Sequence, residues 1–411
     1  MQFYLHKWLR IAILNLTIVS FIGIILRYKI AFSLPFIDQK QLLHGHSHFA
    51  FTGWVTAALM ALMVAFLYIK GLTDAFKRYR WLLITNLISA YGMVLSFPVE
   101  GYGLFSISFS TLSVAVSYVF AVYFWKDAKR LQLTSISRYW FNAACLFSVI
   151  SSLGAFALSF MMAAHVIHQN WYLSSNYYYL HFQYNGWFFF ACMGLIADKL
   201  ELLQINHKWS KAIFYIFFLA CFPAYFLSTL WMPLPVWLYV LVIVAALAQV
   251  VGWFMFLKII VSNKAILNNA TSKTGKVLLM LSAFACTVKV LLQTISVYPP
   301  ISDLAFGFRP IVIGYLHLVL FGVITLGILG YMASSKFISL GKTAVTGIII
   351  FVTGMIFNEI MLLMQGAEGM EYVYIPYSNE LLLLAALIIF TGLVLFVTSQ
   401  YKNKILNEAN A

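Results

Sequence analysis

The sequence predicts an all-α integral membrane protein, a polytopic bundle of about twelve transmembrane helices. Hydrophobic residues make up 63% of the 411-residue chain and charged residues only 9%, which excludes a soluble globular domain. The apolar residues form long continuous runs rather than the alternating pattern of a transmembrane β-strand. Because lipid offers the backbone no hydrogen bonds, such runs cross a membrane as helices.

Twelve apolar runs reach the length of about 20 residues that crosses a bilayer. An even number of crossings predicts that both termini lie on the same side of the membrane. The runs lie at about residues 11–28, 46–69, 80–98, 105–125, 140–164, 177–197, 211–230, 236–257, 277–296, 310–333, 343–364 and 380–400.

The distribution of positive charge identifies that side. The chain carries 26 Lys and Arg against 12 Asp and Glu, a net charge of +14. The basic residues form no domain of their own, so we expect the lipid bilayer, and no nucleic acid, as a partner. Because Lys and Arg concentrate in cytoplasmic loops, we expect a bacterial cytoplasmic (inner) membrane with both termini cytoplasmic. The basic loops lie at residues 70–80, 126–138, 199–211, 258–276 and 336–342.

A short motif recurs three times along the chain. A histidine is followed five residues later by a glycine, in the second, sixth and tenth predicted helices, as His48–Gly53, His181–Gly186 and His317–Gly322. The equal spacing of four helices predicts a pseudo-threefold repeat of four-helix units within one membrane domain. The predicted units are roughly residues 1–130, 131–265 and 266–411 of the single domain 1–411.

Most of the nine histidines gather near the predicted outer face of the membrane. A polar ring in lipid costs free energy unless it finds a partner, so intramembrane histidines are functional candidates. The alternative is that each one hydrogen-bonds a neighbouring helix. The residues concerned are His44, His46, His48, His165, His168, His181 and His317.

Helical spacing suggests which histidines act together. His44 and His48 share one helix face, His46 points away from it, and His165 and His168 share a face of the fifth helix. Two kinds of site are compatible with this pattern. One is a haem held by imidazoles from different helices. The other is a copper or zinc site in which His44 or His46 joins the pair on the fifth helix.

Several other polar groups lie inside or beside the apolar runs. Lys289 and Arg309 are on the side where haem propionates need cations. An ion pair between Lys289 and Glu359, or a proton relay, is the alternative. The glycine of each motif would let a flat macrocycle approach the helix, or would serve close helix packing. The cysteines show no metal-ligand spacing and are expected to be buried packing residues: Cys145, Cys192, Cys221 and Cys286.

The stretch from His44 to Gly53, where His-x-His precedes an apolar segment with glycine, resembles a known family. That family contains the catalytic subunits of haem-copper oxidases and nitric oxide reductases, the cytochrome c oxidase subunit I-like proteins. The resemblance covers the whole chain in helix number. It implies twelve helices in a pseudo-threefold arrangement, with ligand histidines near the outer side.

The resemblance also implies roles for individual residues. Histidines on helices two and ten would hold a low-spin b-type haem, which maps to His317 with His48, His44 or His46. The family's histidine on helix six binds copper, which maps to His181.

The chain departs from the family at two places. A second histidine on helix ten is replaced by Tyr315, and residues 211–230, the seventh helix, contain no histidine. The dinuclear haem–copper centre therefore cannot be assembled as it is in the family. Either His165 and His168 replace the missing ligands, or the chain binds haem without reducing oxygen.

These observations lead to the hypothesis of a haem-binding membrane protein that handles electrons or a small gas, O2 or NO, near the outer face. If it is catalytic, it is an oxidoreductase, and it receives electrons from a donor protein or other membrane subunits. The alternative is a transporter of a transition metal or small solute with histidines at its outer mouth. The three motifs share one orientation, which disfavours the inverted repeat of many transporters.

Overall fold

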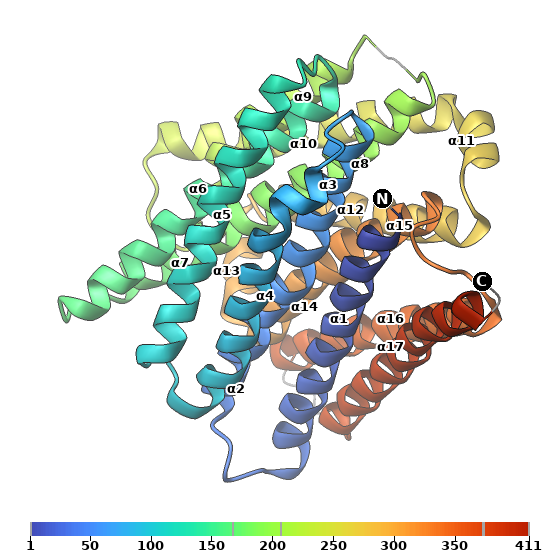
Figure 1. Ribbon diagram of the computed structural model, residues 1–411. Helices are drawn as coiled ribbons and strands as arrows, with labels where there is room; N and C mark the ends of the chain where they lie inside the picture. The colour runs from blue at the N-terminus through green and yellow to red at the C-terminus, as the bar shows by residue number, and fades with distance from the viewer. Residues whose placement is uncertain (1, 167, 206–207, 372–374, 410–411) are drawn as a thin grey trace. The chain divides into compact units, whose positions relative to one another are not determined.

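The computed structural model describes residues 2–166, 168–205, 208–371 and 375–409 (Figure 1). These residues are predominantly helical, and no β-strand occurs among them. Eleven of the described helices are long and apolar enough to cross a membrane. The predicted all-α polytopic membrane fold is therefore confirmed.

The chain divides into two compact units. The first comprises residues 1–116, 273–275 and 328–411, and the second comprises residues 117–272 and 276–327. These units group residues that contact one another and do not test for an internal repeat. The three predicted repeat units therefore stay a prediction. The first unit contains α1 (Gln2–Phe32), α2 (Gln39–Phe49), η1 (Ala50–Thr56), α3 (Ala57–Ile69), α4 (Ala75–Glu100), most of α15 (Leu326–Ser334), α16 (Lys342–Glu371) and α17 (Ser378–Ala409).

Helix α5 (Leu104–Arg130) begins in the first unit and continues in the second. The second unit also contains α6 (Ile136–Ala163), α7 (Gln169–His181), η2 (Phe182–Phe188), α8 (Phe189–Leu202), α9 (Ser210–Ala224), η3 (Tyr225–Thr229), α10 (Val236–Ser262), α11 (Lys264–Ala270), nearly all of α12 (Lys273–Ile295), α13 (Pro299–Gly307), α14 (Arg309–His317) and η4 (Leu318–Thr325).

The predicted span at residues 177–197 is not among the eleven apolar helices. It lies inside an unbroken helical stretch, Gln169–Leu202, formed by α7, η2 and α8. That stretch is long enough for a bilayer, but His181, Gln183 and Asn185 lower its mean hydropathy. The polar residues that are candidates for a functional role in this segment are thus also the ones that lower its hydropathy.

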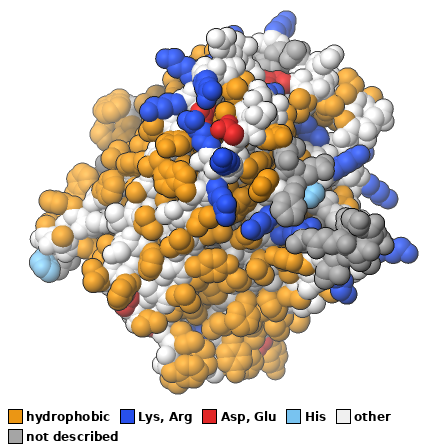
Figure 2. Space-filling model, in the orientation of Figure 1, with side chains coloured by type: hydrophobic (Ala, Val, Ile, Leu, Met, Phe, Trp, Pro, Cys, Tyr) orange, Lys and Arg blue, Asp and Glu red, His pale blue; other side chains and the backbone are white. Residues whose placement is uncertain are grey.

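The outer surface of the protein is largely apolar. Hydrophobic side chains cover much of the face seen in Figure 2. Val99, Val236 and Leu363 expose 83%, 79% and 74% of their surface. Exposed apolar patches of this kind are unfavourable in water and mark contact with a membrane or a partner. Together with the apolar helices, they are consistent with contact to the lipid bilayer.

Glycines bring α16 and α17 into close contact in the first unit, where the two helices run side by side (Figure 1). A Cβ on Gly347 would lie 2.7 Å from the Gly392 carbonyl oxygen, and one on Gly354 would lie 2.8 Å from the Ile389 nitrogen. Small residues commonly allow such backbone approach between membrane helices.

Three short π-helical segments interrupt the α-helices, and each coincides with one copy of the repeated motif. Segment η1 begins two residues after His48, whereas η2 and η4 begin one residue after His181 and His317. Each segment contains the glycine of its motif. A π-turn widens the helix locally and often occurs at functional sites.

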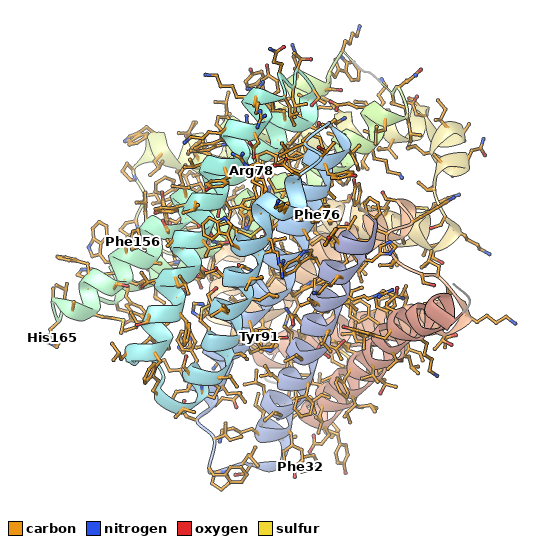
Figure 3. The ribbon with its side chains drawn as sticks, viewed as in Figure 1. Phe32, Phe76, Arg78, Tyr91, Phe156 and His165 are labelled. Carbon is orange, nitrogen blue, oxygen red and sulfur yellow. The ribbon has the colours of Figure 1, made fainter. Side chains whose placement is uncertain are left out.

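Polar side chains from neighbouring helices bond to carbonyls of two π-segments. In the first unit, Asn15 Nδ2 donates to the Gly53 carbonyl (2.6 Å) and Asn86 Nδ2 to the Thr52 carbonyl (3.1 Å). Tyr91, on α4 (Figure 3), donates in turn to Asn15 Oδ1 at 2.6 Å. In the second unit, Ser282 Oγ donates to the Val323 carbonyl of η4 at 2.7 Å.

Protein side chains fill the space beside each motif glycine. A Cβ on Gly53 would lie 2.8 Å from the Phe49 ring, one on Gly186 would lie 2.6 Å from Phe147 Cβ, and one on Gly322 would lie 2.9 Å from Ala285 Cβ. Of the two roles expected for these glycines, close packing of the protein is the one observed.

Gly186→Ala is expected to lower the free energy of unfolding by about 1–3 kcal/mol, because its Cβ would overlap that of Phe147, which cannot rotate away. Thermal unfolding of the detergent-solubilised protein measures the effect. Gly307→Ala is the matched control, since no atom lies within 4 Å of its added Cβ. Equal stability of the two variants would contradict the packing role.

Candidate functional site

The three histidines of α2 divide between its two sides, as their spacing predicts. His48 stacks flat on Phe97 of α4, with ring centroids 4.6 Å apart and planes at 10°. His44, one turn earlier, lies beside Phe97 (6.0 Å) and against the ring of Tyr102 (4.9 Å). His46 faces α1 instead, where its Cε1 would lie 3.6 Å from a Cβ on Gly23.

Two of these imidazoles carry a buried nitrogen that no described residue satisfies. The atoms are Nε2 of His44 and Nδ1 of His46. Buried polar atoms nearly always find a hydrogen bond, so unsatisfied ones are informative exceptions. Neutral imidazole nitrogens of this kind are potential metal ligands.

His165 and His168 do not share a helix face, so that expectation was wrong. Helix α6 ends at Ala163, and His165 follows in a left-handed conformation with φ 51°. Its N–H bonds to the Met162 carbonyl, while the N–H of the next residue bonds to Met161, the pattern that terminates many helices. His168 instead begins α7, where its Nδ1 accepts from the Trp171 N–H at 3.4 Å.

Both of these histidines are exposed. Figure 3 shows His165 at the tip of the turn between α6 and α7. Because α6 ends before His165 and His168 caps α7, the two histidines do not form the predicted i, i+3 pair on one helix face.

His181 is the most deeply buried histidine of the motif set, with 2% of its surface exposed. Its Nε2 lies 2.9 Å from the Cys221 carbonyl oxygen, and its Nδ1 lies 3.2 Å from Asn185 Nδ2. Because a carbonyl only accepts, Nε2 carries the hydrogen and Nδ1 accepts from the amide. Both ring nitrogens are thereby satisfied.

The local geometry of α9 explains why Cys221 needs this hydrogen bond. In an α-helix, the N–H of Tyr225 would bond to the Cys221 carbonyl. Helix α9 instead changes at Tyr225 into the 3₁₀ segment η3, and this N–H bonds to Phe222 and Pro223. His181 replaces the missing donor, so a metal bound at His181 would have to displace a hydrogen bond that stabilises the fold.

His317 lies in the second unit at the junction of α14 and η4. Its half-buried ring stacks on Phe321, with centroids 5.2 Å apart and planes at 29°. Arg309 begins the same helix and is exposed, whereas Lys289 of α12 is buried, with 9% exposure. Of the two cations that the sequence predicts for haem propionates, one is therefore exposed and the other is buried.

Glu359 and Lys289 belong to different units. In the first unit, Glu359 Oε1 accepts from Asn358 Nδ2 at 3.1 Å and interacts electrostatically with Arg27 of α1. The ion pair between Lys289 and Glu359 stays a prediction.

No group of three or more His, Cys, Asp or Glu side chains is arranged to hold a metal ion among the described residues. The four cysteines are buried and free, as expected. The sequence-based interpretation overlooked Asn15, Asn86 and Asn185. Their signal was present, because amides inside apolar runs commonly hydrogen-bond a neighbouring helix.

Comparison with known proteins identifies no family for this chain. No protein-family model matches it. No curated protein matches it either.

His181→Phe is expected to destabilise the protein by about 1–3 kcal/mol, because the Cys221 carbonyl loses its donor while an aromatic ring stays at the position. Thermal unfolding in detergent measures this loss. His165→Asn is the control, since its side chain is exposed and asparagine tolerates the left-handed backbone there. A stable His181→Phe protein would exclude the structural role.

Proposed function

We propose that this chain is a haem-binding integral membrane protein that handles electrons or a small gas, O2 or NO, near the outer membrane face. One observation carries the proposal: a histidine lies one or two residues before a π-helical segment three times, each time five residues before the glycine of the repeated motif. Such segments often accompany functional sites.

His48 in the first unit and His317 in the second are each proposed, taken separately, as a residue that would bind haem iron. Each ring is half-buried and stacks on one aromatic side chain, Phe97 or Phe321. For His48, no hydrogen bond to a described residue occupies the ring nitrogens. An apolar, aromatic surrounding and a neutral imidazole suit an iron ligand. His181 is not part of the proposed ligand set, because both of its nitrogens are engaged in the fold.

A haem, when bound, would supply reversible one-electron transfer, and a vacant iron position would bind gas. The protein's own residues would fix the imidazole planes. The 10° stacking of His48 on Phe97 restricts rotation of that ring. The family resemblance also implies copper, so the metal analysis of the purified protein described below includes copper.

Purified wild-type protein is expected to show the Soret band of a low-spin haem and to contain iron. His48→Ala and His317→Ala should each lose this spectrum, whereas His181→Phe and the exposed variant His165→Asn should keep it. Spectra of the oxidised and reduced protein, with metal analysis, measure the effect. A carbon monoxide shift would identify an open iron position.

Absence of a Soret band and of extractable haem in wild-type protein would refute the proposal. Retention of the low-spin spectrum in both His48→Ala and His317→Ala would refute the ligand assignment while leaving haem binding intact.

The topology is part of the same proposal: a bacterial cytoplasmic membrane with both termini inside. The stretch Gln169–Leu202 decides it, because twelve crossings place the termini on one side and eleven place them on opposite sides. Fluorescent-protein and alkaline-phosphatase fusions at each end are expected to report both termini as cytoplasmic. An extracytoplasmic C-terminus would show that this stretch does not cross.

A further inference from the structure

Helices α9 and α10 form an antiparallel pair in the second unit, joined by residues 225–235. The two helices pack closely, since a Cβ on Gly252 of α10 would lie 2.9 Å from Ile216 Cγ2 of α9. At the end away from the connection, Lys258 Nζ of α10 lies 5.2 Å from the ring centroid of Trp209, which caps the start of α9. The start of α9 and the end of α10 therefore lie side by side.

Each helix of the pair exposes an apolar stripe that ends in a lysine. Between residues 244 and 258 of α10, the exposed side chains recur every three or four residues, the spacing of one helix face. They are Val244, Leu247, Val251, Phe254 and Lys258. The exposed side chains between residues 211 and 222 of α9 are Lys211, Ala212, Tyr215, Leu219 and Phe222. The two lysines are at the same end of the pair.

The exposed face of α10 has the length of a bilayer's hydrocarbon core. Trp237, with 69% of its surface exposed, is the second residue of α10 and lies 21 residues before Lys258. That separation corresponds to about 32 Å along a helix, and the hydrocarbon core is about 30 Å thick. Tryptophan favours the interface between membrane and water. With Trp237 at one interface, Lys258 reaches the level of the phospholipid headgroups at the other.

The lysine end of the pair is rich in positive charge and poor in negative charge. Lys208 and Lys264 are exposed close in sequence to the two stripe lysines. The sequence contains seven lysines and no acidic residue between Glu201 and Asp303. Glu201 itself accepts hydrogen bonds from the first backbone N–H groups of α6. Neither stripe lysine forms a hydrogen bond or an ion pair with a described residue, so no described carboxylate pairs with these two charges.

We propose that the α9–α10 pair binds an anionic phospholipid at this end. The lipid phosphate lies between Lys211 and Lys258, and the acyl chains lie along the two apolar stripes. The cation–π contact with Trp209 holds the Lys258 ammonium group at the headgroup level. Lysine stems lie on apolar surface while their charged ends attract anionic headgroups. This inference goes beyond the proposed function and does not depend on haem binding.

The test is a lipid titration of the full-length protein in dodecyl maltoside micelles, followed by native mass spectrometry. Dioleoyl-phosphatidylglycerol and dioleoyl-phosphatidylcholine are added separately. Because the two lipids carry the same acyl chains, the difference in binding measures the effect of headgroup charge. Wild-type protein should bind the first molecule of phosphatidylglycerol about 10-fold more tightly than phosphatidylcholine, because two ammonium groups attract the anionic headgroup.

The double variant Lys211→Gln/Lys258→Gln should bind the two lipids equally, whereas Lys211→Arg/Lys258→Arg should keep the preference. The matched control is Lys126→Gln/Lys129→Gln, which removes the same charge from exposed positions at the end of α5 in another basic loop and should also keep it. All of these side chains are exposed, so the unfolding temperature in detergent should stay at the wild-type value in each variant.

Retention of the preference in Lys211→Gln/Lys258→Gln would overturn the proposal. Equal loss of the preference in the α5 control would overturn it as well, because it would show a general attraction of a basic protein for anionic lipid. Glycerol phosphate, which has the headgroup charge without acyl chains, should bind at least about 10-fold more weakly than phosphatidylglycerol. Equal binding of glycerol phosphate would indicate a site for soluble phosphate and would exclude the lipid.

Discussion

The absence of water in the bilayer interior governs where this protein places its polar side chains, because every backbone carbonyl must find a hydrogen bond within the protein. Where a helix departs from regular α-helical geometry, some carbonyls lose their usual backbone donor and need a donor from a side chain. Asn15 and Asn86 donate to carbonyls of η1, Ser282 donates to one of η4, and His181 donates to the Cys221 carbonyl where α9 changes to a 3₁₀ segment. The positions of these four polar side chains are thus explained first by the backbone carbonyls that they satisfy.

The need to satisfy backbone carbonyls gives different roles to histidines that look equivalent in the sequence. His181 belongs to the repeated motif, yet its Nε2 bonds to the Cys221 carbonyl on α9 and its Nδ1 bonds to Asn185 of η2. His48 and His317 occupy the corresponding motif position, but their rings stack on phenylalanines and stay half-buried. A ligand role is therefore proposed for two of the three copies, and a structural role for the third.

The sequence by itself determined the all-α membrane fold, the approximate helix positions and the opposite directions of His46 and His48, because these follow from hydropathy and from the 3.6-residue period of one helix. The tertiary structure decided what these residues contact. Phe147 fills the space beside Gly186, and Cys221 engages His181 from 40 residues away. The helix end before His165 was also misjudged, since an apolar run continues through it. Such outcomes depend on contacts between distant segments and on local backbone geometry, which residue spacing along one helix does not encode.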